Sequence, residues 1–219
     1  MGSRRALRRI ARRQDLGLAA REYTTLARLD TPLRIQAFVS AIPANHEPQG
    51  ETLHSVRNVL RLRVAHCMEG ALVAACALWI HGEPPLLLHL DCAPHDHPHV
   101  IALFRRGRAW GAISKSNGTW LRYREPVYRD LRELAMSYFH EFFDRDGRKT
   151  LRSYGRPFDL RRVDPAAWVT APGPCWDVHD RVAAGVHRAL LTPEQARALS
   201  RRDAFERESA RQVQYPAPG

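Results

Sequence analysis

Residues 65–79 read AHCMEGALVAACALW, and this stretch decides the fold of the chain. Small or apolar side chains recur at helical spacing from Cys67 through Ala71 to Leu78, which predicts an α-helix. Because the side chains on this face are small before Leu78, the helix can approach a neighbouring sheet closely. Gly82 stands where glycines commonly terminate helices, and the two prolines that follow shortly prevent continuation. We therefore expect a buried central helix that begins at Cys67.

The hydrophobic period changes after this helix. Residues 86–90, 99–104 and 108–114 each form a short, mostly apolar run, and together they predict three β-strands. The last two runs are separated by an Arg-Arg-Gly sequence at 105–107, which predicts a hairpin turn. A small antiparallel sheet should therefore follow the central helix.

The hairpin turn determines which side chains face each other across these two strands. If Arg106 and Gly107 form a two-residue turn, the numbers of paired residues sum to 213 and His99 lies opposite Ser114. A longer turn would move the partner by one or two residues. Alternation along the strand places Ser114 and Asn117 on opposite faces.

Helical patterns recur on both sides of the strands. We expect a short helix capped by Ser55 and a last helix that starts at Thr192 and Pro193. Helices, a sheet hairpin and further helices in this order predict an α+β domain. The remaining expected elements are helices over 4–29, 33–41 and 127–143, a loop over 43–52, an edge strand at 168–170 and a disordered tail over 215–219.

The composition is that of a folded protein with a basic excess. Hydrophobic residues make up 44% and charged residues 26% of the 219 residues. No apolar run reaches about eighteen residues, so we expect no transmembrane span and no membrane partner. The net charge of +11 comes almost entirely from arginine, and six arginines lie within residues 1–13. Such an arm suits an anionic partner or simply stays solvated, and no zinc-finger or RRM motif supports nucleic-acid recognition.

The four cysteines are spaced unlike any disulfide framework, so we expect free thiols in a reducing, cytoplasmic compartment. The arginines at the N-terminus are followed by no apolar run, which argues against a secretory signal. The cysteines are Cys67, Cys76, Cys92 and Cys175.

Cys67 differs from the other cysteines because it opens the predicted central helix. Unpaired amides and the helix dipole lower the pKa of a thiol at such a position. A nucleophilic thiol also needs a base, and the base needs an orienting partner. His99 opens a following strand, and the strand after it supplies Ser114 or, if it bends, Asn117. Packing of the helix on the hairpin would bring Cys67 and His99 together.

The order of these residues resembles that of the transglutaminase-like cysteine enzymes. Their cysteine motif, roughly Gly-x-Cys followed by small and apolar residues, is similar to AHCMEGAL at 65–72. Their histidine opens a strand, as His99 is expected to do, and their next strand carries a tryptophan four residues before an aspartate. Trp110 matches the tryptophan, whereas Ser114 occupies the position of the aspartate.

The resemblance covers about residues 35–160, and the run over 110–128 is similar to a bacterial subgroup of this superfamily. It implies a papain-like α+β core and a hydrolase or acyltransferase that needs no cofactor. The Cys67 thiol would attack an amide or ester carbonyl of a protein or peptide, form a thioester and transfer the acyl group to water or an amine. Serine can orient the His99 imidazole by a hydrogen bond, but it carries no charge to stabilise imidazolium.

Two other functions fit the same residues. Serine in the place of aspartate also suits a catalytically degenerate transglutaminase-like binding module. Alternatively, the segment 91–99 offers ligand types suitable for zinc, namely Cys92, His95, His97 and His99. A metal would occupy the imidazole nitrogen that a general base needs free.

The chain divides into three parts by composition. The first is an arginine-rich arm or helix over 1–30, and the second is a catalytic domain over 31–165. The third is a C-terminal extension over 166–219 that carries a short helix and the disordered tail.

Overall fold

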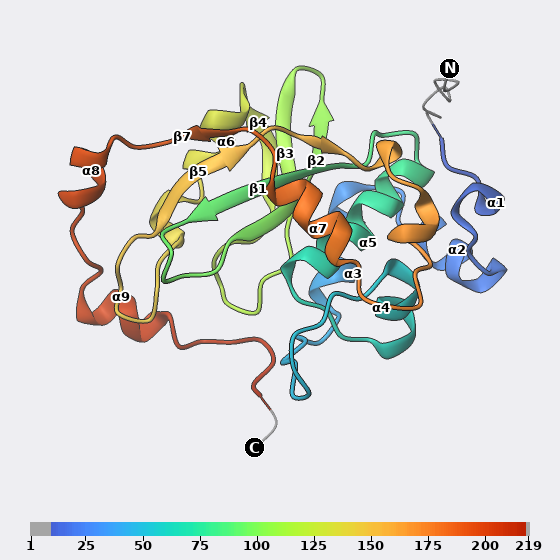
Figure 1. Cartoon of the computed structure of the whole chain (residues 1–219), viewed down its shortest axis with the longest axis horizontal. Helices are drawn as coiled ribbons and strands as arrows, with labels where there is room; N and C mark the ends of the chain where they lie inside the picture. The colour runs from blue at the N-terminus through green and yellow to red at the C-terminus, as the bar shows by residue number, and fades with distance from the viewer. Residues whose placement is uncertain (1–9, 218–219) are drawn as a thin grey trace.

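The protein is a mixed α+β structure built around one antiparallel sheet (Figure 1). The computed structural model describes residues 10–217. Within that range the seven-stranded sheet has the order β4-β3-β2-β1-β5-β7, and the short β6 pairs with β1. The strands are β1 (Leu86–Cys92), β2 (His99–Arg106), β3 (Ala109–Ile113), β4 (Arg124–Tyr128), β5 (Leu151–Gly155), β6 (Phe158–Asp159) and β7 (His187–Ala189).

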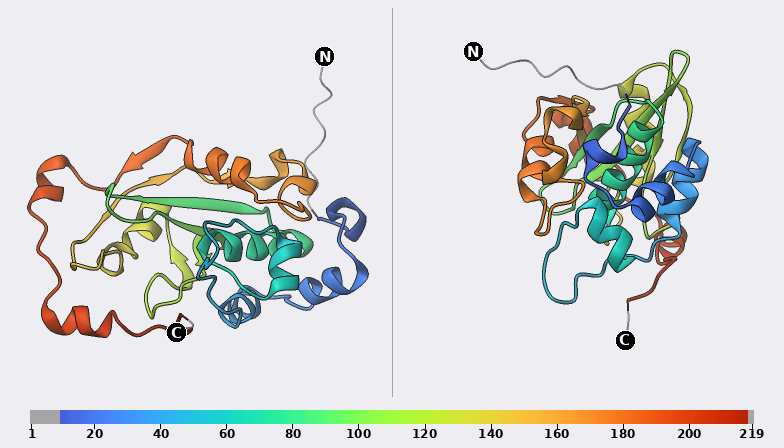
Figure 2. Two further views of the ribbon diagram at one scale, coloured as in Figure 1. Left: turned by 60° about the horizontal axis from the view of Figure 1, so that its bottom comes forward. Right: turned by 90° about the vertical axis from the view of Figure 1, so that its right-hand side faces the viewer.

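Helices pack on both faces of this sheet (Figure 2). No helix within residues 10–217 combines the length and the apolar character needed to cross a bilayer. The α-helices are α1 (Arg13–Leu16), α2 (Ala20–Ala27), α3 (Pro32–Ser40), α4 (Val56–Leu62), α5 (Cys67–Ile80), α6 (Leu131–Met136), α7 (Trp176–Ala183), α8 (Pro193–Arg197) and α9 (Ala204–Ser209), and the 3-10 helices are η1 (Phe139–Glu141), η2 (Leu160–Arg162) and η3 (Pro165–Ala167).

Helix α5 is the central helix that the small-residue pattern predicts. Every residue from Met68 to Ile80 is buried, and the helix lies against β2 with α3 and α4 beside it (Figure 1). Gly70 permits this approach, since a Cβ at position 70 would lie 2.4 Å from the Cβ of Lys115. The helix ends before Gly82, whose φ of 85° lies in the left-handed region as predicted for a terminating glycine.

The sheet has a hydrophobic core on each face, because successive side chains of a strand point to opposite sides. Val100, Ala102 and Phe104 of β2 belong to the core around α5. Ile101 and Leu103 belong to the second core, which α6 and η1 cover. The α+β class is thus confirmed, with a sheet larger than the predicted hairpin and its neighbour.

Segments on both sides of 31–165 contribute to the core around α5. Leu26 of α2 is fully buried there, and the ring of the buried Trp168 stacks on Trp79 with centroids 6.2 Å apart. Strand β7 pairs with β5 in the same sheet. Residues 1–9, which carry four of the six arginines of the predicted arm, lie outside the described residues.

Several predicted elements differ from the structure. The N-terminal helix is interrupted at Gly17, whose left-handed φ of 64° separates α1 from α2, and its predicted start at 4–9 lies outside the described residues. A single helix is expected over 127–143, but residues 127–128 belong to β4. The helix α6 starts only after Asp130, whose side chain caps it by accepting the N–H of Glu133. The edge strand expected at 168–170 is a loop after η3 in which the indole of Trp168 is buried.

Two predicted helix caps are confirmed. The Ser55 hydroxyl accepts the N–H of Asn58 at the start of α4. The Thr192 hydroxyl accepts the N–H of Gln195 at the start of α8. Each satisfies one of the N–H groups that a helix leaves unpaired at its first turn.

Candidate active site

Cys67 is the first residue of α5 and is partly exposed. Two side chains hydrogen-bond its sulfur: His66, which precedes the helix, and His99, which opens β2. Burial alone would raise the pKa of the Cys67 thiol, but these hydrogen bonds and the charges of the two imidazoles hold it well below its ordinary value. The helix N-terminus acts in the same direction.

The other three cysteines have the opposite character. Burial raises the pKa of the Cys92 thiol to about 12 and that of Cys175 to about 11. Burial alone raises the pKa of Cys76 still further. Because the thiolate is the nucleophilic form of cysteine, Cys67 is the one of the four whose surroundings favour that form.

His99 is held by Ser114 on the side away from the thiol. Its Nε2 lies 2.7 Å from the Ser114 hydroxyl oxygen, and that hydroxyl donates to the carbonyl of Leu121 at 2.5 Å. A hydroxyl has one proton, and a carbonyl can only accept, so Ser114 must accept the Nε2–H of His99. This pattern leaves the Nδ1 nitrogen of His99 for Cys67. The structure therefore brings Cys67, His99 and Ser114 together as one connected group.

The predicted register of the hairpin is wrong by two residues. Arg106 pairs with Ala109, so the numbers of paired residues sum to 215 rather than 213. The turn begins at Gly107, which supplies a left-handed φ of 59°. A shift of two residues keeps the same face, so His99 and Ser114 become diagonal neighbours that a long side chain can still bridge.

Backbone contacts fix Ser114 in place. The buried Gln36 of α3 accepts the Ser114 N–H at 2.9 Å and donates to its carbonyl at 2.8 Å. Leu121, the acceptor for the Ser114 hydroxyl, has a φ of 55°, which is uncommon for a residue other than glycine. Its N–H donates to Glu141 at 2.9 Å, and Glu141 is paired with Arg124. These contacts maintain the strained backbone that directs the Leu121 carbonyl at Ser114.

His66 is bound on its other side by the loop before α4. Its Nε2–H donates to the Thr52 carbonyl at 3.0 Å, which leaves Nδ1 for Cys67. Burial alone would lower the pKa of His66, but the hydrogen bond to Cys67 and the negative charges of Cys67 and Glu69 outweigh it and raise the pKa to about 9. His66 is therefore an imidazolium at neutral pH, and it faces the Cys67 thiolate.

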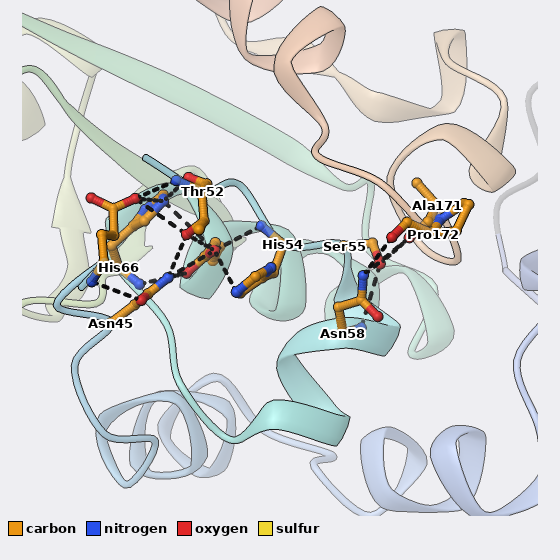
Figure 3. A network of polar contacts seen from close by, with 10 residues as sticks. Asn45, Thr52, His54, Ser55, Asn58, His66, Ala171 and Pro172 are labelled. Atoms are coloured by element: carbon orange, nitrogen blue, oxygen red, sulfur yellow. Dashed lines mark hydrogen bonds and ion pairs between the residues drawn. The ribbon is translucent and has the colours of Figure 1, made fainter. Parts of the chain in front are cut away.

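A fully buried carboxylate, that of Glu69, ties this loop to α5. It accepts the backbone N–H groups of His66 at 2.8 Å and His54 at 2.7 Å. It also accepts the side-chain amide of Asn45 at 3.2 Å, while the same amide donates to Thr52 at 2.7 Å. Figure 3 shows the partner residues Asn45, Thr52, His54 and His66 gathered in one polar network. The carboxylate thus fixes both the thiol-bearing turn and the loop that holds His66.

A cavity of about 330 Å³ opens at Cys67. Its wall includes the loop residues Asn45 and His46 and the segment 115–117 that follows β3. Asn45 uses its amide hydrogens within the Glu69 network, so it is not a free donor toward a substrate. The N–H of Cys67 lies in the first turn of α5, where helix geometry leaves it without an intrahelical acceptor.

The side chain of Asn117, the alternative orienting residue, is hydrogen-bonded to Tyr215, whereas His99 is hydrogen-bonded to Ser114. Its side-chain amide donates to the carbonyl of Tyr215 at 2.8 Å, and its side-chain oxygen accepts the Tyr215 N–H at 2.9 Å. Tyr215 belongs to the tail expected to be disordered, and these bonds hold it instead. The expectation for 218–219 lies outside the described residues.

Two of the residues considered as zinc ligands are engaged with other partners. His95 pairs with Asp144 at 3.2 Å, and His99 is engaged with Ser114. Within residues 10–217 no three histidine, cysteine or acidic side chains come together as a metal site. The geometry thus does not support a zinc site built from Cys92, His95, His97 and His99.

Sequence patterns leave three participants of the site unrecognised. His66 has the pattern of an exposed helix-start residue, yet its ring is only 25% exposed and contacts the thiol. Glu69 stands at the third position after His66, the spacing of a capping box, which is the signal that could have identified it. Gln36 carries no such signal, because its partner lies 78 residues away.

No protein-family model matches the chain, and no curated protein sequence matches it. Its function must therefore be inferred from its own residues and their geometry.

Proposed function

We propose that the protein is a cysteine-dependent acyltransferase or amide hydrolase with a papain-like, transglutaminase-like core. One observation carries the proposal: Cys67 begins a buried helix and bonds to His99, whose other nitrogen is held by Ser114. A nucleophile, a base and an orienting group in this connection are what acyl transfer through a thioester requires. The lowered pKa of Cys67 supports the same chemistry.

The first half of the reaction forms a thioester. The reaction starts with Cys67 as the thiolate and with a proton on Nδ1 of His99, and the Cys67 sulfur forms a bond to the carbonyl carbon of an amide or ester. As the tetrahedral intermediate collapses, the carbon–nitrogen or carbon–oxygen bond breaks, and His99 returns its proton to the leaving group. The N–H of Cys67 is the donor best placed for the developing oxyanion, because it lies at the helix N-terminus beside the attacking sulfur.

The second half releases the acyl group. His99 takes a proton from a water molecule or an amine, the new nucleophile bonds to the thioester carbonyl, and the carbon–sulfur bond breaks. Cys67 then recovers the thiolate form that the His66 imidazolium stabilises. Hydrolysis and acyl transfer differ only in which nucleophile reaches the thioester.

Ser114 limits what the third residue contributes. It fixes the tautomer and orientation of His99 through a neutral hydrogen bond, whereas a carboxylate would also stabilise imidazolium by its charge. The charged partner in this site is instead His66, whose imidazolium pairs with the Cys67 thiolate. The ion pair therefore involves the nucleophile and not the base His99.

An acylation experiment tests the proposal. With p-nitrophenyl acetate, we expect a burst of about one equivalent of nitrophenolate and a single acetyl adduct on the intact protein. Cys67→Ala should abolish both, whereas Cys92→Ala, which removes another partly exposed thiol, should retain them. Addition of an amine during the steady state distinguishes transfer from hydrolysis by its product.

Two results would contradict the proposal. One is a folded wild-type protein with no acyl adduct, which would favour a binding module. The other is an adduct that persists in Cys67→Ala.

A further inference from the structure

The C-terminal segment lies on the rim of the Cys67 cavity, far in sequence from the residues that form it. After β7 the chain passes through α8 and α9 at the end of the sheet remote from α1 and then returns toward α3 (Figures 1 and 2). Val213 forms an antiparallel bridge with Gly118, and the Gln214 N–H donates to the Asn117 carbonyl at 2.7 Å. Residues 213–215 therefore lie beside 117–118, joined to them by an isolated antiparallel bridge and this hydrogen bond.

Asn117 binds the main chain of this segment at two points. Its side-chain oxygen accepts the N–H of Tyr215 at 2.9 Å, and its amide donates to the carbonyl of the same residue at 2.8 Å. The ring of His46 donates a second hydrogen bond to that carbonyl at 3.1 Å. These contacts involve the backbone of Tyr215 alone, so they do not depend on which side chain stands at this position.

The Tyr215 side chain occupies a separate position with its own selectivity. Its ring lies under the ammonium group of Lys115, 5.0 Å from nitrogen to ring centroid, and its hydroxyl donates to the Ser40 carbonyl at 3.0 Å. The Lys115 ammonium also donates to the carbonyl of Ile42. A fixed cation above the ring favours an aromatic residue at this point.

The same rim residues line the cavity of the thiol. His46, Lys115 and Asn117 form part of the wall around Cys67. A peptide held by these residues lies at the rim of the cavity that opens at Cys67, and Tyr215 of the chain itself contacts them there.

We propose that Lys115, Asn117 and Ser40 form a subsite for an extended peptide with an aromatic residue, and that the segment 213–215 occupies it as an intramolecular competitor. This assignment rests on the proposed function, for which it names the substrate class as unfolded peptide segments. It also gives the tail a regulatory role, since substrate binds only when the tail leaves. A tethered segment competes at an effective concentration that reaches the millimolar range for short linkers.

A binding measurement tests the subsite without any need for turnover. The probe is a fluorescein-labelled peptide, RQVQYPA, which reproduces residues 211–217, and all proteins carry Cys67→Ala. We expect a chain that ends at Gln212 to bind the probe at least about ten-fold more tightly than the full chain, by fluorescence anisotropy. A probe with alanine in place of tyrosine should bind about ten-fold more weakly, and Asn117→Ala in the shortened chain should remove binding.

A second variant avoids any effect of truncation on folding. Tyr215→Ala in the full chain should weaken the tail and raise probe affinity, whereas Phe205→Ala, which alters an 84% exposed aromatic of α9, should not. Equal probe affinity in the full and shortened chains, or binding unaffected by Asn117→Ala, would overturn the inference. If Cys67 acylates but the probe does not bind, only this inference fails; if the probe binds but Cys67 never acylates, only the proposed chemistry fails.

Discussion

At the scale of single residues, the reactivity of Cys67 depends on the charge of His66. His66→Gln removes an imidazolium whose pKa is raised to about 9 and whose hydrogen bond and charge lower the pKa of the thiol. In the wild type we expect iodoacetamide to alkylate Cys67 at nearly the same rate at pH 6 and pH 8, because the thiolate persists below its ordinary pKa and His66 stays protonated until about pH 9. In His66→Gln the alkylation rate should fall steeply between pH 8 and pH 6. The expected change approaches the roughly hundred-fold decrease of an ordinary thiol with a pKa of ~8.5.

His81→Gln is the matched control, because His81 caps the opposite end of α5 and is exposed. It should leave the pH profile unchanged. A flat profile in His66→Gln would show that His99 and the helix N-terminus alone sustain the thiolate.

The sequence identifies the members of the site that have local signals. Cys67 opens a recognisable helix, and His99 and Ser114 lie at the ends of recognisable strands, so all three could be named before their geometry was known. The wrong register did not change the prediction that His99 and Ser114 meet, because a shift of two residues leaves side chains on the same face of a strand. Gln36 could not be identified in this way, since its role depends on the packing of α3 against the end of β3.

At the scale of elements, the distance between α5 and the segment after β3 depends on Gly70. Gly70→Ala places a Cβ 2.4 Å from the Cβ of Lys115, so either the helix or Lys115 must move. Overpacking costs about 1–3 kcal/mol, against a gain of up to about 1 kcal/mol in helix propensity. We expect a net loss of about 1–2 kcal/mol in the free energy of unfolding, measured by urea denaturation.

Gly173→Ala is its control, because a Cβ at position 173 meets nothing within 4 Å. Its effect should stay within about 0.5 kcal/mol. A Gly70→Ala protein more stable than the wild type would mean that the helix can move away from the strand at little cost.

Elements with a regular pattern were predicted better than elements that the sheet itself stabilises. Helix α5 and strands β1 and β2 have continuous apolar patterns, and their positions follow from the sequence. Strand β5 reads LRSYG, which has no clear alternation, because its place beside β1 depends on partners elsewhere in the chain. Strand propensity is a property of neighbours as much as of residues.

At the scale of the whole molecule, the two ends of the chain pack on the centre. The segment after residue 165 places Trp168 on Trp79 of α5, and Ser55 and Asn58 of α4 donate to the Ala171 carbonyl (Figure 3). The helix that carries Cys67 is therefore supported by the region expected to be an extension. This leads to the proposal that the region cannot be removed without loss of the site.

Replacement of Trp168 tests this dependence. Trp168→Ala removes a fully buried indole, and such a truncation costs about 3–5 kcal/mol of the free energy of unfolding. The indole nitrogen has no hydrogen-bond partner within residues 10–217, so no hydrogen bond is lost and we expect a cost near the lower end of this range. Trp176→Ala, at a 37% exposed indole of α7, should cost less than about 1 kcal/mol. Urea denaturation followed by circular dichroism measures both free energies of unfolding. Alkylation of Cys67 at pH 6 should be lost at the urea concentration at which the protein unfolds. A cost below about 1 kcal/mol for Trp168→Ala, with alkylation intact, would instead mean that the C-terminal region folds apart from the domain that holds Cys67.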